Sequence, residues 1–205
     1  MSMTAEQAEA RQQAVLGQPM RIAPLAEHEL GAEVRALVER IGAAVGYENP
    51  EELTIYFALM ARHPGFFRCQ METGIMFLGE ARIPFREREL AVLRTAWLVG
   101  APYEWSEHIR IARKLGVSAE ETERLTIGSA APGWTPHERA LLCAVEELVA
   151  DRMISDPTWA LLAQSYDEQQ LIELPALVGQ YLGVAMIQNS LRVPLTEFCN
   201  GFADR

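Results

Sequence analysis

The chain has 205 residues, of which 49% are hydrophobic and 22% are charged, and its formal net charge is −10. This balance is typical of a globular protein, and the acidic charge argues against a nucleic-acid or anionic-membrane partner, because both require a basic surface. The three cysteines are far apart and form no CxxC, which favours a reducing compartment over a disulfide framework or a zinc site. No apolar run resembles a signal-peptide core or is long enough to span a bilayer, so we expect a cytoplasmic protein without membrane contact.

The first part of the chain predicts a series of helices. Residues 1–26 are expected to form an N-terminal arm, in which the polar residues 1–20 are either frayed or a short surface helix. After the arm, apolar residues recur with a period of 3.6, and proline-containing helix starts punctuate them. The predicted helices run over 27–45, from Asn49-Pro50 to about His63, over 66–78, and onward from Pro84.

Residues 86–116 predict two helices separated by a tight corner at Gly100-Ala101-Pro102. Leucines and Trp97 at helical spacing give the first of these helices a buried stripe. Glu89 lies beside this stripe. A carboxylate in such a place is costly unless it is paired or hydrogen-bonded, so Glu89 is expected to have a specific role.

Glu104 and His108 lie four residues apart in the second helix, so their side chains point the same way about one turn from each other. Together with Glu89 across the corner, they predict a proton-transfer site. His108 is the expected general acid or base, because its ordinary pKa lies near physiological pH. A buried Glu89 with a raised pKa beside a neutral His108 would suit such a shuttle, and Glu104 would orient the imidazole.

The second part of the chain continues the helical pattern. Gly128–Gly133 is rich in small residues and is the best candidate for an internal boundary. Helices are predicted from the cap at Ser118 to about Ile127, from Thr135-Pro136 through Val149, from Asp156-Pro157 through Leu162, and from Asp167 to Leu191. No segment shows the alternation of a strand, so the prediction is an all-α fold with one domain over 27–205 and its core motif at 84–130.

A weak internal duplication is also visible. The segment that starts at Pro84 has a helix, a corner, a second helix and a capped third helix, and the segment that starts at Pro136 has the same order. The second copy has no histidine or paired acids at the matching positions. Any site is therefore expected in the first copy.

The run R-E-R-E-L-A-V-L-R-T-A-W, followed by G-A-P-Y-E-W-S-E-H, resembles the carboxymuconolactone decarboxylase and AhpD-like alkylhydroperoxidase superfamily, most closely over about residues 50–130. The resemblance implies an AhpD-like helical bundle that assembles as a trimer, a hexamer or a related ring, with its site near a subunit interface. It also implies a small-molecule substrate and no organic cofactor.

The sequence departs from the peroxidase branch of this superfamily at the thiols. That branch carries C-x-x-C-x-x-x-H, and alignment on His108 puts Ala101 and Glu104 where the cysteines would be, while Glu89 matches the upstream glutamate. Thiol peroxidase chemistry needs a reactive thiolate and a resolving partner, which neither residue can supply. Compared with that branch, this sequence therefore retains the acid–base residues of the site and lacks its redox cysteines.

Several residues also have structural interpretations. Glu89 could pair with Arg86, Arg82 or another arginine, and His108 could simply be a packed histidine bonded to Glu104. Glu89, Glu104 and His108 could in principle be metal ligands, but no second Glu-x-x-His pair accompanies them, so no metal site is predicted.

Neighbouring side chains carry further expectations. Tyr103 and Trp105 are expected to line the substrate pocket, and Arg94 to form a surface or interface salt bridge. His63 and His137 sit beside helix ends and are expected to be structural. Cys69 and Cys143 are expected to be inert core thiols.

Three functions follow from these observations. The first is a carboxymuconolactone decarboxylase-like, cofactor-independent lyase that acts on a small carboxylated or lactone-type molecule through Glu and His. The second is a thiol-dependent alkylhydroperoxidase, which would require Cys69, Cys143 or Cys199 to approach His108. The third is a non-catalytic oligomer that binds a small molecule.

Overall fold

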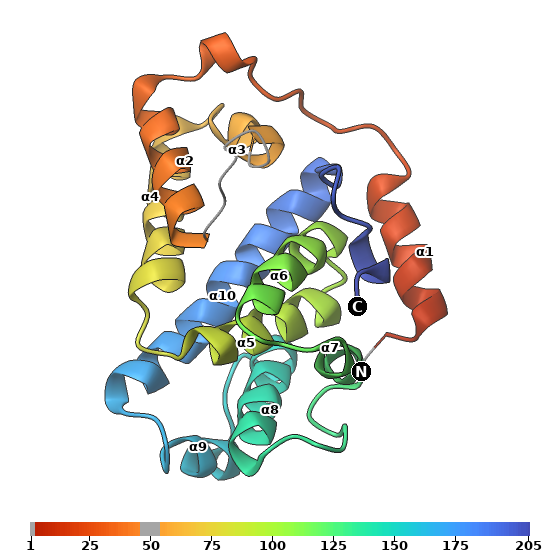
Figure 1. The fold of residues 1–205 in the computed structure, drawn as a ribbon, viewed down its shortest axis with the longest axis vertical. Coiled ribbons are helices and arrows are strands. Elements are labelled where there is room, and N and C mark those ends of the chain that lie inside the picture. Colours follow the sequence, from red (N-terminus) through yellow and green to blue (C-terminus); the bar gives the residue numbers. More distant parts are fainter. Residues whose placement is uncertain (1–2, 46–53) are drawn as a thin grey trace.

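The computed structural model describes residues 3–45 and 54–205, and within these ranges every regular element is helical (Figure 1). The predicted all-α fold is confirmed for the described residues. The longer helices are α1 (Ala5–Leu16), α2 (Ala32–Val45), α3 (Thr54–Met60), α4 (Pro64–Ile75), α5 (Phe85–Leu98), α6 (Pro102–Lys114), α7 (Ala119–Ile127), α8 (Pro136–Asp151), α9 (Asp156–Leu162) and α10 (Glu168–Leu191). Short turns lie at η1 (Glu27–Glu29), η3 (Met76–Glu80) and η4 (Gly201–Ala203).

Helix starts follow the capping signals of the sequence closely. Ser118, Thr135 and Asp167 each accept a hydrogen bond from the backbone N–H three residues later, and all three starts are complete capping boxes. Elements follow one another in the same order in α5–α7 and α8–α10, as the internal duplication predicts. The predicted start at Asn49-Pro50 lies outside the described residues.

Boundaries differ where the chain bends. The predicted helix over 27–45 is divided into η1 and α2, and Pro84 precedes α5 as its N-cap instead of being its first residue. The predicted helix over 66–78 starts at Pro64 and continues beyond α4 as a π-helical turn over Met76–Glu80. A π turn cannot be read from apolar spacing, and such turns occur frequently at functional sites.

Two hydrophobic clusters divide the interior. The larger one is built on α5, α6, α8 and α10, whose buried side chains include Leu93, Trp97 and Leu141. The smaller one joins α2, α3 and α4, and it reaches Tyr103 on α6 and Val184 on α10. Figure 1 shows α2 and α4 on one side of the long, central α10, with α5 and α6 lying against that helix. Helices α6 and α10 therefore face both clusters.

Gly128–Gly133, predicted as a boundary, is instead held firmly against the core. Arg94 is 3% exposed and donates hydrogen bonds to the backbone oxygens of Leu125, Thr126 and Ile127, while it pairs with Glu146. Gly128 has φ +97°, and a Cβ there would lie 2.2 Å from a guanidinium nitrogen of Arg94. The interpretation of Arg94 as a surface salt bridge is thus wrong, because its buried guanidinium donates to the last backbone carbonyls of α7, which have no partner within the helix.

The N-terminal arm is helical over α1 and docks on the C-terminal turn η4. Gln12 accepts a hydrogen bond from the backbone N–H of Phe202 at 2.8 Å, and Arg11 donates to the carbonyl oxygen of Gly100 at 3.1 Å. Of the two expectations for residues 1–20, the helix holds and the frayed arm does not.

Helix α10 is, in the described part of the chain, long and apolar enough by length and composition to cross a membrane. Core helices of globular proteins meet the same criterion. Here α10 packs against α5, α6 and α8, and it presents Gln180, Tyr181 and Gln188 to a cavity. These contacts are those of a core helix.

Phe202 offers a test of how much the C-terminal turn contributes to stability. Its ring is 3% exposed and packs edge-on against Trp97 at 5.2 Å between centroids, whereas Phe198 is 59% exposed. Phe202→Ala should lower the free energy of unfolding by about 3 kcal/mol or more, because a large buried ring is removed. The matched control Phe198→Ala should cost less than about 1 kcal/mol. Urea denaturation of both variants measures this, and equal losses would contradict the packing described.

Candidate functional site

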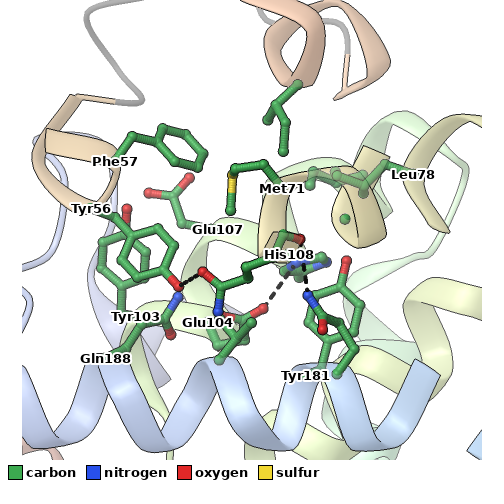
Figure 2. A pocket seen from close by; sticks show the side chains of 16 residues that line it. Tyr56, Phe57, Met71, Leu78, Tyr103, Glu104, Glu107, His108, Tyr181 and Gln188 are labelled. Carbon is green, nitrogen blue, oxygen red and sulfur yellow. Dashed lines mark hydrogen bonds and ion pairs between the residues drawn. The ribbon is translucent and has the colours of Figure 1, made fainter. Parts of the chain in front are cut away.

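A cavity of about 110 Å³ lies where the two hydrophobic clusters meet (Figure 2). Its described walls come from six elements of the chain. Helices α2 to α4 and the π turn supply Ile41, Tyr56, Phe57, Gln70, Met71, Gly74 and Leu78; α6 supplies Tyr103, Glu104, Glu107, His108 and Ile111; α10 supplies Gln180, Tyr181, Val184 and Gln188.

His108 holds together the acids that the sequence singles out. Its Nδ1 lies 2.7 Å from Oε2 of Glu89, and its Nε2 lies 3.2 Å from Oε1 of Glu104. The ring of Tyr181 packs edge-on against the imidazole at 4.8 Å between centroids. All three titratable side chains are buried, and Glu89 is 0% exposed. The predicted convergence of Glu89, Glu104 and His108 is therefore present in the structure.

Arg88 extends this group into the protein interior. Its Nε and Nη2 both lie 2.7 Å from Oε1 of Glu89, so each oxygen of that carboxylate has its own cationic partner. The guanidinium also donates to the carbonyl oxygens of Phe77 and Leu78, at 3.2 and 2.9 Å, in the π turn. We call the four side chains Arg88, Glu89, His108 and Glu104 the charge row. It runs from the π turn to the cavity wall.

The charge row determines the protonation state of its members. Burial alone lowers the pKa of His108, but the Glu89 carboxylate and the contact with Glu104 outweigh burial and raise that pKa to about 10. Burial raises the pKa of Glu89, yet His108 and Arg88 together hold it below its ordinary value. At neutral pH, His108 is an imidazolium and Glu89 a carboxylate. The expectation of a raised Glu89 pKa beside a neutral histidine is therefore wrong, because it left out the second cation, Arg88.

The predicted site residues occupy different places. Glu104, His108 and Tyr103 line the cavity, whereas Glu89 lies behind His108 and is not part of the lining. Trp105 is 0% exposed, donates to the backbone oxygen of Asp204, and packs against other aromatic rings on the opposite side of α6. The expectation that Trp105 lines the pocket is wrong, because Tyr103 and Trp105 are two residues apart and therefore project from the helix about 200° apart.

Sequence reasoning missed the wall contributed by other elements. Tyr56, Tyr181 and Gln188 are distant from the motif in sequence, and only tertiary packing brings them to the cavity. Burial raises the pKa of Tyr56 and of Tyr181, so both hydroxyl groups stay neutral. Arg88 was missed although it directly precedes Glu89, because adjacent helical positions are not expected to face each other.

The other histidines lie away from the cavity. His63 caps α4 by accepting from the N–H of Phe66, and His137 lies 3.1 Å from Glu87 and packs against Tyr166. These placements agree with the structural roles expected for both.

None of the three cysteines lines the cavity. Cys69 is exposed, so the expectation that it is a core thiol is wrong; Cys143 is partly buried and Cys199 is buried. Burial raises the pKa of Cys199, which makes its thiol less reactive.

A metal site finds no support in the donor geometry. Both ring nitrogens of His108 already face carboxylates. Within the described ranges, no group of three or more His, Cys, Asp or Glu side chains has the arrangement that could hold an ion.

A model of a known protein family matches the region of the motif. Residues 67–147 match the model of the carboxymuconolactone decarboxylase family, which confirms the resemblance seen in the sequence. The match starts in α4 and ends within α8, so it begins and ends later than the expected range of about 50–130. No curated protein matches the chain by sequence.

Solved structures share the fold at low sequence identity. An uncharacterised peroxidase-related protein with an alkylhydroperoxidase AhpD core, from Ralstonia eutropha JMP134, is 16% identical, with a TM-score of 0.71 over 88% of this chain and 94% of its own. The debrominase Bmp8 in complex with 2,3,4-tribromopyrrole is 15% identical, with a TM-score of 0.72 over the same shares, 88% and 94%. A protein of unknown function from Agrobacterium tumefaciens, suggested to be the antioxidant defence protein AhpD, is 19% identical, with a TM-score of 0.62 over 66% and 94%. At these identities the likeness shows the fold.

The charge row predicts a specific dependence of stability on pH. Because folding raises the pKa of His108 from 6.5 to about 10, its contribution is fully present below pH 6.5 and is lost as the pH rises toward 10. The free energy of unfolding should therefore fall over this range, with His108 contributing at most about 1.4 kcal/mol per pH unit. The pKa of Glu89 is lowered in the folded protein, so its contribution to the free energy of unfolding is present above its ordinary pKa of 4.5 and is lost as the pH falls below that value.

Chemical denaturation between pH 6 and pH 10 measures the alkaline loss. His108→Gln should flatten the curve relative to the wild type. Parallel curves for the wild type and His108→Gln would show that the imidazole is not held in its charged form.

Proposed function

We propose, from the premise that residues 67–147 form a carboxymuconolactone decarboxylase family region, that this protein is an enzyme that transfers a proton at a carbon beside a carbonyl or lactone group of a small organic molecule. No organic cofactor is needed for such a step. The observation that carries the proposal is the charge row, which ends at a cavity of about 110 Å³ with Glu104 and His108 in its wall.

We propose different roles for the three titratable residues. Glu104 faces the cavity as a carboxylate whose negative charge is balanced by the His108 imidazolium 3.2 Å away. Glu104 is therefore the group that takes a proton from the substrate or returns one to it, with His108 as the proton reservoir next to it. Glu89 and Arg88 lie behind and hold the imidazole in position, so their action is indirect.

The mostly apolar walls of the cavity favour this chemistry. Because Glu104 and His108 are buried, the interaction between them is strong, and a proton moved between them is shielded from bulk solvent. The same arrangement serves the protonation step of a decarboxylation, in which the developing carbanion takes a proton as carbon dioxide leaves. In either reaction, the essential step is the transfer of a proton between Glu104 and a substrate carbon.

Exchange of substrate protons with solvent tests the proposal directly, because it requires no identified product. The protein is incubated in D₂O with a panel of cyclic ketones and lactones, and the replacement of C–H by C–D beside the carbonyl is followed by NMR. Glu104→Gln and His108→Gln should each slow the exchange by about 100-fold or more, because general acid–base catalysis contributes at least that much.

The matched control for this experiment is His137→Gln, which removes a second Glu-paired histidine outside the cavity. Its exchange rate should equal that of the wild type. Exchange that is as fast in both site variants as in the wild type would exclude Glu104 and His108 as the groups that move the proton.

Thiol-dependent peroxidase activity, the alternative function, has less support. Cys199 contacts a residue of the cavity wall, since its Sγ lies 3.5 Å from Oε1 of Glu107. Burial, however, raises the pKa of its thiol. A variant with Cys69, Cys143 and Cys199 all replaced by Ser should retain any peroxide reduction that the wild type shows. A loss of more than about tenfold in a peroxide-reduction assay would restore the thiol mechanism.

We also propose, from the family resemblance, that the protein self-associates in a ring and is cytoplasmic. The exposed apolar side chains of α9 and α10 support self-association, since large apolar surface is often an interface. These side chains are Trp159, Leu161, Ile172 and Met186, with exposed fractions of 43%, 49%, 70% and 59%.

A further inference from the structure

Gln188 is a polar group of the cavity wall that the proposed proton transfer does not use. It projects from α10, is 3% exposed, and lines the cavity with Glu104 and His108 (Figure 2). Its Oε1 has no hydrogen-bond partner among the residues that the structure describes. A buried carbonyl oxygen without a donor is costly and uncommon, so a ligand that supplies a donor would relieve this cost.

The charges of the wall restrict what that ligand can be. Glu104 is balanced by His108, and Glu107 pairs with Arg110 at 3.6 Å and accepts a hydrogen bond from Thr196 at 2.8 Å. The described lining contains no lysine or arginine, and the sequence of residues 46–53 contains none either. An anionic ligand would face two carboxylates, and the one cation of the described lining, His108, already has both ring nitrogens engaged by Glu89 and Glu104. A cationic ligand would find the lining carboxylates already paired. The wall therefore favours a neutral molecule.

The remaining wall is suited to a flat apolar group. Phe57, Tyr56, Tyr181 and Met71 line the cavity, and aromatic and thioether side chains pack well against rings. The volume of about 110 Å³ is of the same order as the roughly 150 Å³ of a cavity known to hold benzene. A single small ring is the size of ligand that this volume indicates.

We propose that the cavity binds a neutral, ring-sized molecule that donates an O–H or N–H hydrogen bond to Oε1 of Gln188. Gln188 is thus a specificity-determining residue, which selects molecules with a donor over molecules of the same shape without one. This inference shares its cavity with the proposed function and names the substrate class for it. A neutral substrate favours proton transfer beside a carbonyl over the loss of a substrate carboxylate.

Equilibrium binding of four probes to the full chain at pH 7 distinguishes neutral donors from neutral non-donors, anions and cations. Each probe carries one benzene ring. Phenol is neutral with a donor, anisole is neutral without one, benzoate is an anion and benzylammonium is a cation. Phenol should bind about fivefold or more tightly than anisole, as expected for one added hydrogen bond, and about tenfold or more tightly than either ion.

Two variants on α10 assign the difference to one amide. Gln188→Met keeps the length of the side chain and removes the acceptor, so phenol should fall to the affinity of anisole while anisole changes by less than about twofold. Gln180→Met is the matched control, because Gln180 lines the same cavity but its amide donates to the backbone oxygen of Gln70 at 3.4 Å. The phenol-to-anisole ratio should survive this change.

The inference is overturned if benzoate or benzylammonium binds as tightly as phenol, if no probe binds, or if Gln188→Met leaves the phenol-to-anisole ratio unchanged. Its failure is distinct from failure of the proposed function, because binding is measured without turnover. A preserved preference for phenol with no C–H exchange would remove the enzyme and keep the ligand class. If C–H exchange occurs but Gln188→Met leaves the phenol-to-anisole ratio unchanged, the proposed enzyme function is kept and the proposed role of Gln188 is removed.

Discussion

The site depends on two carboxylates and two cations that alternate in a buried row. Such groups lose their hydration on folding, and their mutual attraction compensates only when the geometry is good and every polar atom is satisfied. Here each oxygen of Glu89 contacts a different cation, and each nitrogen of His108 contacts a different carboxylate. Groups of opposite sign therefore alternate along the whole row, and each buried group has a partner.

The same row ties the chemistry to the backbone. Arg88 donates to two carbonyl oxygens of the π turn, and that turn contributes Leu78 to the cavity wall. These oxygens lie in the last turn before the helix ends at Glu80, where backbone carbonyls have no partner within the helix, so Arg88 can donate to them. The wall that meets the ligand and the group that orients the imidazole are consequently parts of one connected unit.

The sequence carried the local features of this site and few of the distant ones. The corner before Pro102, the spacing of Glu104 and His108, and the capping boxes are determined within a few residues, so they could be predicted. Tyr103 points into the cavity, whereas Trp105 points into the core on the other side of α6. The neighbouring sequence does not specify which side of α6 meets the cavity. The walls from α4 and α10 are set by packing between elements far apart in the chain. The charge state of His108 was mispredicted for a related reason, because it depends on how many partners converge there.

The contacts behind α6 have a consequence for how the site is assembled during synthesis. Asp204 accepts hydrogen bonds from Trp105 and Ser106, and α10 supplies another wall, yet both are translated long after α6 itself. Domains generally begin to fold while the ribosome is still extending the chain. A nascent chain that has reached only α8 would hold the row's charges without the helix that shields them, so water would reach them. The low-dielectric surroundings of the imidazole therefore arise late in biosynthesis, when α10 and the residues after it have emerged and closed over the motif.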